Sequence, residues 1–425
     1  MTRAPGALVC LSVAAFLGGQ EPPRPPENLV PGPPRAGINA AAEDLAEAAF
    51  SLGIDFDAES PGVAHPAAED VAALQQTGAS GWLADQVMVP DDSIGPEPAR
   101  LRQFLEDRSG ALWRIVAILE KGVPEWPSAS RAAGASSRFV ATLRLSNVLL
   151  ATALAEEGSG RTSDAARLLG ASWTLYRSLS RERTMLADLI AIAVARLQAG
   201  ALRKFREPPI EWSNRLSNED PWQAALDAFA SDPREAAAAD PRLALDALSG
   251  SFANVNARAH VAGADALRRL PPCDLAGVSN EEIARPISDE FRKASQPGTD
   301  SAEVAQVFTD IVVPNFRNHL ERAGRLAIDN ELTLRILELR LARASARDRR
   351  WPDALPDDAS SACPGASYAY ERDGSAMQIA FKGEAPSPST GLALPLSFAT
   401  RADRRPTPHP AAPASAPMTP APPRT

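Results

Sequence analysis

Metal-binding and cofactor-binding motifs are missing from this sequence, and so are the common catalytic motifs. Cysteine occurs three times and histidine four times, with no HExxH helix and no Cys-x-x-Cys pair. Zinc binding and thioredoxin-like redox chemistry are therefore unsupported. GxSxG, SxxK and Walker patterns do not occur either. We expect no metal, no cofactor and no catalytic residue, which favours a non-enzymatic protein without excluding an enzyme. His319 is interpreted as an ordinary residue on a helix face.

Lysine and aromatic residues are also scarce. Lysine occurs only at Lys121, Lys204, Lys293 and Lys382, and aromatic residues make up 5% of the 425-residue chain. The formal net charge is −9, and no basic stripe is interleaved with aromatic residues. Surfaces that bind nucleic acid are basic as a rule, so we expect no nucleic-acid partner.

The N-terminus has the pattern of a signal peptide. Arg3 precedes an apolar run at residues 7–19, and a proline-rich segment follows. The run has the length of a signal-peptide core and is too short to span a bilayer. We predict a signal peptide at 1–20, cleavage between Gly18 and Pro26, and a disordered linker at 21–38. The mature protein would be periplasmic or secreted, with no stable membrane span. A buried N-terminal helix is the alternative.

Two cysteines remain once the signal peptide, which carries Cys10, is removed. Cys273 and Cys363 are 90 positions apart in a chain that we expect to be exported. Two thiols in an exported protein are more often bridged than free. We predict a structural disulfide between them, worth roughly 4–5 kcal/mol in the chain-entropy model.

The centre of the chain reads as three consecutive helices within residues 138–205. The third, at 185–197, is apolar almost all the way round. A helix with no polar face must be covered on every side, and this one is too short to cross a membrane. It is therefore predicted to be the centre of a helical domain.

Further helices are marked by their periodicity and caps. Residues 101–119 carry apolar side chains at helical spacing and predict one amphipathic helix. Capping pairs open others: they are Asp220 with Gln223, Asp232 with Glu235, and Ser279 with Glu282. Asp240 is expected to open a helix that reaches about Leu270.

A long helix and a small β unit are predicted near the C-terminus. Apolar residues alternate in steps of four and three from Phe316 to Leu341, which indicates a long helix across the helical domain or an intermolecular coiled coil. Alternating residues at 368–370, 377–381 and 392–398, with a hairpin signal at Asp373-Gly374, predict three strands. The expected units are a helical domain at 39–350, a β unit at 351–400 and a disordered tail at 401–425.

A buried polar pair is predicted at the centre of the three helices. Asp188 is the only ionisable residue between Met185 and Ala195. A buried carboxylate requires a partner, because an unpaired buried charge is costly. Arg144 and Asn147 lie three positions apart on an otherwise apolar helix and so share a face. We predict that Asp188 pairs with Arg144, with Asn147 close by.

Three stretches carry a resemblance to a known group of proteins. They are residues 39–41, residues 143–179, and LARASARDRRWPDAL at 341–355 with YAYERDG at 368–374. On these stretches the chain resembles uncharacterised bacterial envelope proteins with a repeat-like helical domain, a long helix and a small β unit. Its last part also resembles the helix and meander of secretion pseudopilins, although Cys363-Pro364-Gly365 stands where their DPxxG-like turn would be. The resemblance implies no activity.

These observations together predict a mainly α protein. We expect stacked helical hairpins, tetratricopeptide-like, with a long C-terminal helix and a small antiparallel β meander. Such stacks leave a concave surface that binds peptides or proteins. The expected function is therefore an exported interaction or scaffold protein of the bacterial envelope, with a protein or peptide partner there. The alternative is an envelope hydrolase that uses carboxylates in a helical cleft.

Overall fold

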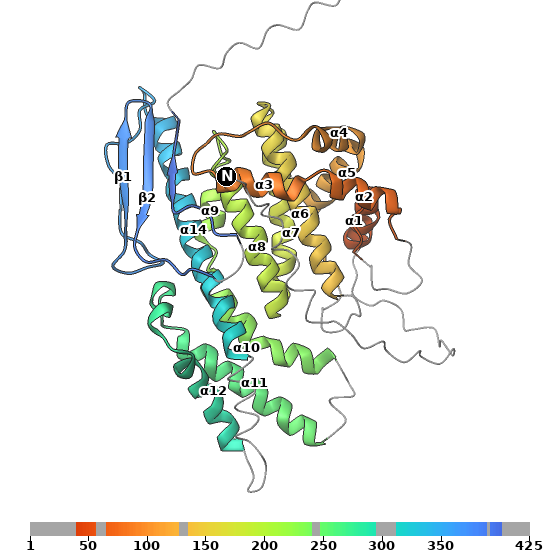
Figure 1. Ribbon diagram of the computed structural model, residues 1–425, viewed down its shortest axis with the longest axis vertical. Coiled ribbons are helices and arrows are strands. Elements are labelled where there is room, and N and C mark those ends of the chain that lie inside the picture. The colour runs from red at the N-terminus through yellow and green to blue at the C-terminus, as the bar shows by residue number, and fades with distance from the viewer. Residues whose placement is uncertain are drawn as a thin grey trace, which may run out of the picture.

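The computed structural model describes residues 40–56, 65–126, 135–239, 247–294, 312–388 and 392–401. The predicted signal peptide, the linker and all of the tail except Arg401 lie outside these residues. The described chain is mainly helical, with one small sheet (Figure 1). Its helices are α1 Ala40–Phe50, α2 Ala68–Gln76, α3 Ala79–Met88, α4 Ala99–Asp107, α5 Ser109–Lys121, α6 Ala135–Gly158, α7 Thr162–Ser180, α8 Met185–Leu202, α9 Glu211–Ser217, α10 Pro221–Ala239, α11 Ala247–Leu267, α12 Asn280–Ala294 and α14 Val313–Ser345, with the 3-10 helix η3 Pro272–Gly277.

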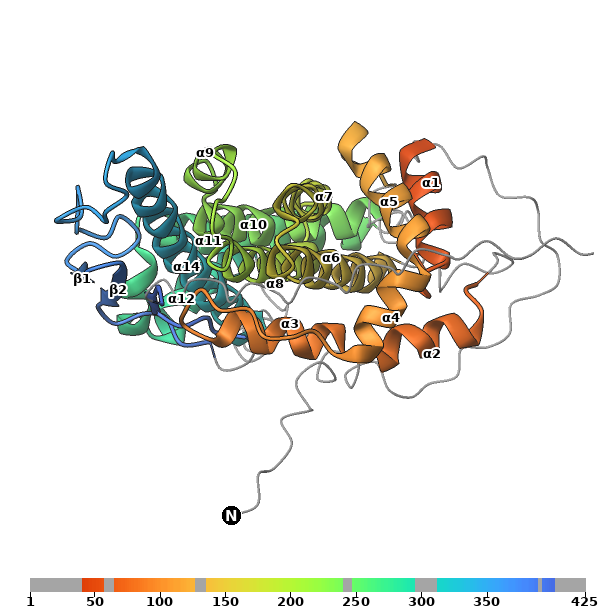
Figure 2. The same ribbon diagram turned by 90° about the horizontal axis from the view of Figure 1, so that it is seen from above.

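Helix α8 lies at the centre, as its apolar sequence predicts. It packs against α3, α6, α7, α10 and α14 (Figures 1 and 2). Helix α3 also contacts α6, and α5 contacts α7. Two side chains cap its first turn: Thr184 Oγ1 accepts the Ala187 N–H at 3.2 Å, and Asp232 Oδ1 accepts the Met185 N–H at 3.0 Å. The helix runs five residues further than predicted, to Leu202.

Helices α6 and α8 also have the length and composition of membrane spans. The candidate windows lie in Arg138–Gly158 and Met185–Leu202, with mean hydropathies of 1.3 and 1.6. In each case 67% of the window is buried inside the protein. Mostly buried core helices share this composition, so these properties do not by themselves indicate a membrane protein.

Helix α14 separates the helical bundle from the sheet. In Figure 1 it runs along the whole edge of the bundle, from α10 and α12 at one end to the strands at the other. Its predicted apolar seam, including Phe316, Leu320 and Leu337, is buried within this chain. Its opposite face, including Ile328 and Ile336, packs on the strands. The long helix therefore crosses the face of the helical domain and belongs to both cores.

The sheet is a three-stranded antiparallel meander, β1 Ser367–Asp373, β2 Ala376–Lys382 and β3 Ser397–Ala399, in that order. The hairpin turn is shifted by one residue from the prediction. Asp373 pairs with Ala376, so Gly374 and Ser375 form the turn, with Gly374 at a φ of 57°. The predicted third strand is also shorter, because β3 covers only its last residues.

Two helix boundaries differ from the prediction. The amphipathic stretch at 101–119 is divided into α4 and α5 at Arg108, whose ψ of 12° leaves the helical range and whose guanidinium pairs with Asp70 of α2. Asp232 does not begin a new helix, because α10 continues through it. Its carboxylate caps α8 instead. The caps at Asp220 and Ser279 are confirmed by their hydrogen bonds.

Candidate functional site

The structure corrects the predicted partner of Asp188. Its carboxylate is buried, and its Oδ2 lies 2.9 Å from Nε2 of the fully buried His319 on α14. Arg144 is exposed on another face of α6, and Asn147 donates a hydrogen bond to Ser80 of α3. The predicted partners lie on α6, two helices earlier in the chain, but α8 also packs against α14. His319 is therefore a core residue and not an ordinary helix-face residue.

The two predicted cysteines are brought together by the fold. Cys273 in η3 and Cys363 before β1 have Cα atoms 5.4 Å apart, within the range of a disulfide. Cys363 is buried beneath the sheet. A cysteine pair at this distance is typical of proteins in oxidising, extracytoplasmic compartments.

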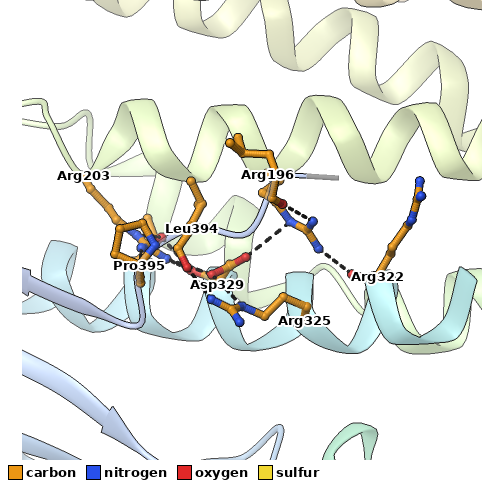
Figure 3. Close-up of polar contacts among 9 residues, drawn as sticks. Arg196, Arg203, Arg322, Arg325, Asp329, Leu394 and Pro395 are labelled. Carbon is orange, nitrogen blue, oxygen red and sulfur yellow. Dashed lines mark hydrogen bonds and ion pairs between the residues drawn. The ribbon is translucent and has the colours of Figure 1, made fainter. Parts of the chain in front are cut away.

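The most highly charged part of the core is centred on Asp329 of α14. Its carboxylate is fully buried and lies 3.4 Å from Arg196, 3.5 Å from Arg203 and 3.6 Å from Arg325 (Figure 3). Burial raises the pKa of the Asp329 carboxyl, and the guanidinium groups of Arg203, Arg196 and Arg325 oppose that rise. We call these four residues the Asp329 cluster.

The arginines of the Asp329 cluster also hold the chain segment that leads into β3. Arg196 and Arg325 donate to the carbonyl oxygens of Leu392 and Leu394, and Arg203 donates to that of Pro395 at 2.8 Å (Figure 3). These carbonyls would need strand partners if 392–396 were in the sheet. Guanidinium groups supply the donors instead, which explains why the predicted third strand is short.

Two further buried cations lie at the C-terminal end of α8. Lys204 Nζ donates to the carbonyls of Val89 and Asp91, at 2.8 and 2.6 Å. Arg340 of α14 donates to the last carbonyls of α8, Leu202 at 3.2 Å and Arg203 at 2.7 Å. Cations at a helix C-terminus also match the negative end of its dipole.

The pKa values of both cations are depressed, but not far enough to remove their charge at neutral pH. Burial lowers the pKa of Lys204 to about 8, although Asp91 and Asp92 oppose the change. Burial lowers the pKa of Arg340 to about 10, against the attraction of Asp92 and Glu157. Both side chains therefore remain largely cationic at pH 7.

A large open cavity lies beside these two cations, with a volume of about 1090 Å³. Its walls come from the ends of α6, α8 and α14, the loop after α14, the β1–β2 turn and the end of β3. It therefore lies between the helical bundle and the sheet, at the C-terminal end of α14. We call it the basic cleft, after the eight basic residues that line it: Lys204, Arg206, Arg340, Arg343, Arg349, Arg350, Arg372 and Arg401.

The residues that line the basic cleft carry charges of both signs, and the positive charges are in excess. Four acidic residues share the lining with the eight basic ones: Asp92, Glu157, Glu207 and Asp348. Arg350 pairs with Asp348 at 3.3 Å, Arg401 pairs with Asp91 at 2.9 Å, and Arg372 pairs with Asp353. The excess contrasts with the net charge of −9 for the whole chain.

Two arginines at the rim of the basic cleft keep their charge available. The side chains of Arg206 and Arg349 are exposed, and neither makes an ion pair or side-chain hydrogen bond with the described residues. Arg349 has a φ of 52°, which is uncommon outside glycine. Backbone conformations of this kind are concentrated at functional sites.

Sequence reasoning missed the basic cleft. Its residues come from positions between 92 and 401, and no local motif joins them. The one indication in the sequence is the stretch from Arg343 to Arg350, which is rich in arginine and has Asp348 as its single acidic residue. Among the described residues, no group of three or more His, Cys, Asp or Glu is placed to hold a metal ion.

Comparison of the chain with protein-family models, with curated proteins and with solved structures found no match.

Proposed function

We propose that this chain is an exported, non-enzymatic binding protein of the bacterial envelope, whose basic cleft holds an acidic segment of a partner protein. The predicted signal peptide and a bridge between Cys273 and Cys363 fit an oxidising compartment outside the cytoplasm. The helical hairpins, predicted to stack like tetratricopeptide repeats, would serve as the rigid frame that presents the cleft.

The observation that carries the proposal is the charge of the cleft. Eight basic residues against four acidic ones line a cavity of about 1090 Å³, larger than most small-molecule sites. The cavity is open and many of its lining residues are charged, which suits a charged chain segment more than a purely apolar ligand. Buried cations beside a partly enclosed cavity attract anions more strongly than exposed ones do, because solvent screens them less.

The mixed sign of the lining favours a polypeptide over a uniform polyanion. Asp92, Glu157 and Glu207 would repel nucleic acid or polyphosphate along the same walls. An acidic peptide can offer carboxylates to the arginines and donors to these acids. This matches the partner class predicted from sequence.

Binding is also better supported than hydrolysis. A hydrolase with two carboxylates needs one of them protonated at working pH, hence with a raised pKa. Burial raises the pKa of Glu219, Glu338 and Asp329, but none of these lines the basic cleft.

The cleft is tested by peptide binding. Fluorescence anisotropy of the mature chain with a short synthetic peptide rich in Asp and Glu should show binding that weakens with salt, and a charge-reversed Lys and Arg peptide should bind less. The double variant Arg206→Ala and Arg349→Ala should weaken the acidic peptide about tenfold, since each open charge contributes up to ~1 kcal/mol.

The matched control is Arg285→Ala. Arg285 is an exposed arginine on α12, at the opposite end of the molecule from the cleft (Figure 1). Its loss should leave peptide affinity unchanged. Equal binding of both peptides, or an unchanged affinity in the double variant, would refute the proposal.

Export is tested separately by sequencing the N-terminus of protein recovered from the envelope. The mature chain should begin between Gly18 and Pro26. An intact Met1 in a cytosolic fraction would exclude export without bearing on the cleft.

A further inference from the structure

Helices α6 and α8 each expose a large apolar side chain near the N-terminal end. Val140 of α6 is 43% exposed, and Leu186 of α8 is 36% exposed. Among the described residues, only three other large apolar side chains are this exposed: Met88, Val89 and Ile210. Single exposed apolar residues are ordinary, whereas several on one surface indicate a contact site.

Val140 and Leu186 lie on the same side of the bundle. Helix α3 lies across α6 and α8 on that side (Figure 1), where Asn147 of α6 donates to α3 and Gly200 of α8 packs closely against Val87. Val140 precedes Asn147 by seven residues, and Leu186 precedes Gly200 by fourteen. At 3.6 residues per turn, each side chain lies within about 40° of the residue that meets α3. Both helices therefore turn an apolar side chain to this side, ahead of the part that α3 crosses.

Three partly buried residues extend this apolar surface along the two helices. We call the whole set the α6–α8 face: Val140, Leu143, Leu186, Leu189 and Ala193. No acidic residue of α6 or α8 belongs to it. Glu156 and Glu157 lie in the last turn of α6, and the Asp188 carboxylate points to His319 of α14. The face therefore offers apolar contact and no negative charge from these helices.

Two exposed arginines border the α6–α8 face. Arg144 follows Val140 by one turn of α6, and Arg183 precedes Leu186 by three residues. Neither makes an ion pair or side-chain hydrogen bond with the described residues. Arg144 also lines an open cavity of about 290 Å³ whose lining includes no acidic residue. The border thus carries positive charge that the described residues leave unpaired, and this charge is complementary to an anionic surface.

We propose that the α6–α8 face docks on the surface of an anionic phospholipid bilayer. Its apolar side chains would enter the boundary between headgroups and acyl chains, and Arg144 and Arg183 would contact lipid phosphates. This inference goes beyond the proposed function, because the basic cleft lies at the C-terminal ends of α6 and α8 and the face lies near their N-terminal ends.

The small extent of the face favours a bilayer over a protein partner. A stable protein interface buries about 800 Å² on each partner and includes several hydrogen bonds. Only two of the five residues of the face are exposed, and the amide of Asn147 beside it already donates to α3. Shallow insertion into a bilayer requires only a few apolar side chains with cations beside them.

Flotation with lipid vesicles tests the proposal. The chain is used without residues 1–20, so that the apolar run at 7–19 does not contribute. At low salt it should float with vesicles made of equal parts phosphatidylcholine and phosphatidylglycerol. Vesicles of phosphatidylcholine alone should bind at least about fivefold more weakly, the effect of one arginine near an anionic surface.

Substitutions in the face test its residues. Val140→Ser combined with Leu186→Ser should weaken binding to the anionic vesicles about tenfold, and Arg144→Ala should weaken it about fivefold. Thermal unfolding should change little, because the three side chains are exposed. The matched control is Ile210→Ser. Ile210 is 71% exposed and directly precedes α9, on the opposite side of the bundle from α3 (Figure 2), so its loss should leave binding unchanged.

Three results would overturn the proposal. The first is equal binding to both kinds of vesicle, or to neither. The second is a double variant of Val140 and Leu186 that binds as the unmodified chain does, or that converts a dimer in solution into a monomer, since the face would then contact a second copy. The third is loss of vesicle binding in the variant Arg206→Ala with Arg349→Ala, which would assign the lipid contact to the basic cleft. Peptide binding in that cleft is measured separately and does not depend on any of these results.

Discussion

The Asp329 cluster and the basic cleft are both rich in arginine and are both built by α8 and α14, but their charges are handled differently. In the cluster, Arg196, Arg203 and Arg325 surround one carboxylate and donate to backbone carbonyls. At the rim of the cleft, Arg206 and Arg349 make no such contacts with the described residues. The hydrogen-bond donors and the charge of a buried arginine must find partners within the fold, whereas an exposed arginine remains available to a ligand.

The largest effect that separates the two regions should come from the cluster. Asp329→Ala leaves three buried guanidinium groups without their shared counter-ion, so the free energy of unfolding should fall by about 3–5 kcal/mol. Urea denaturation measures the loss. The matched control, Asp289→Ala, removes an exposed ion pair with Arg292 and should cost at most about 1 kcal/mol. Equal losses in the two variants would show that the cluster does not stabilise the fold.

The link between the helical bundle and the sheet should give the next effect. Cys273→Ser opens the bridge that the 5.4 Å distance between Cα atoms allows, and the unfolding free energy should fall by about 2–4 kcal/mol. Denaturation with and without a reducing agent measures it, and the reducing agent should have no effect on the variant. Two alkylatable thiols in native exported protein would contradict the bridge.

A smaller effect is expected for the pair of Asp188 with His319. Asp188→Asn should destabilise by about 1–3 kcal/mol, since it replaces the carboxylate that faces the buried His319 ring. A double-mutant cycle with His319→Gln should give a coupling energy of at least about 0.5 kcal/mol. The control cycle with Arg144→Ala should be additive. Coupling to Arg144 in place of His319 would restore the partner expected from sequence.

The smallest expected effect is the pH dependence of peptide binding in the basic cleft. The pKa of Lys204 is lowered to about 8, so its ammonium is cationic below that pH and neutral above it. The affinity for an acidic peptide with acetylated amines should therefore fall a few-fold as pH rises through about 8. Lys204→Arg, which stays charged across that range, should flatten the profile. A profile unchanged by this variant would assign the titration to another group.

Local patterns predicted what depends on local physics. The caps at Asp220 and Ser279 follow from side chains that reach the N–H groups three residues on. The hairpin of β1 and β2 follows from alternation around a glycine turn, and only its register shifts by one residue. Asp232 shows the limit of this reasoning, because its carboxylate caps a different helix.

The candidate site could not be predicted in the same way. Asp188 was expected to reach a helix close in sequence, but its partner His319 lies on α14, more than one hundred positions away. The predicted strand at 392–398 alternates well, yet only its last residues join the sheet as part of β3. Arginine side chains donate to the carbonyls of Leu392, Leu394 and Pro395. Polar contacts between elements that are distant in the chain produce no periodic pattern in the sequence, so they cannot be predicted from it.

The sequence by itself determined the helical class, the central place of the apolar helix α8, the long helix α14 and the strands beside it, because burial of apolar faces has a period of 3.6 or 2 residues. It also pointed to Cys273 and Cys363. Only the tertiary structure decided which charges meet at Asp329 and which remain open in the basic cleft. Electrostatic partners are set by distance in space, and that distance is fixed only when all the elements have packed.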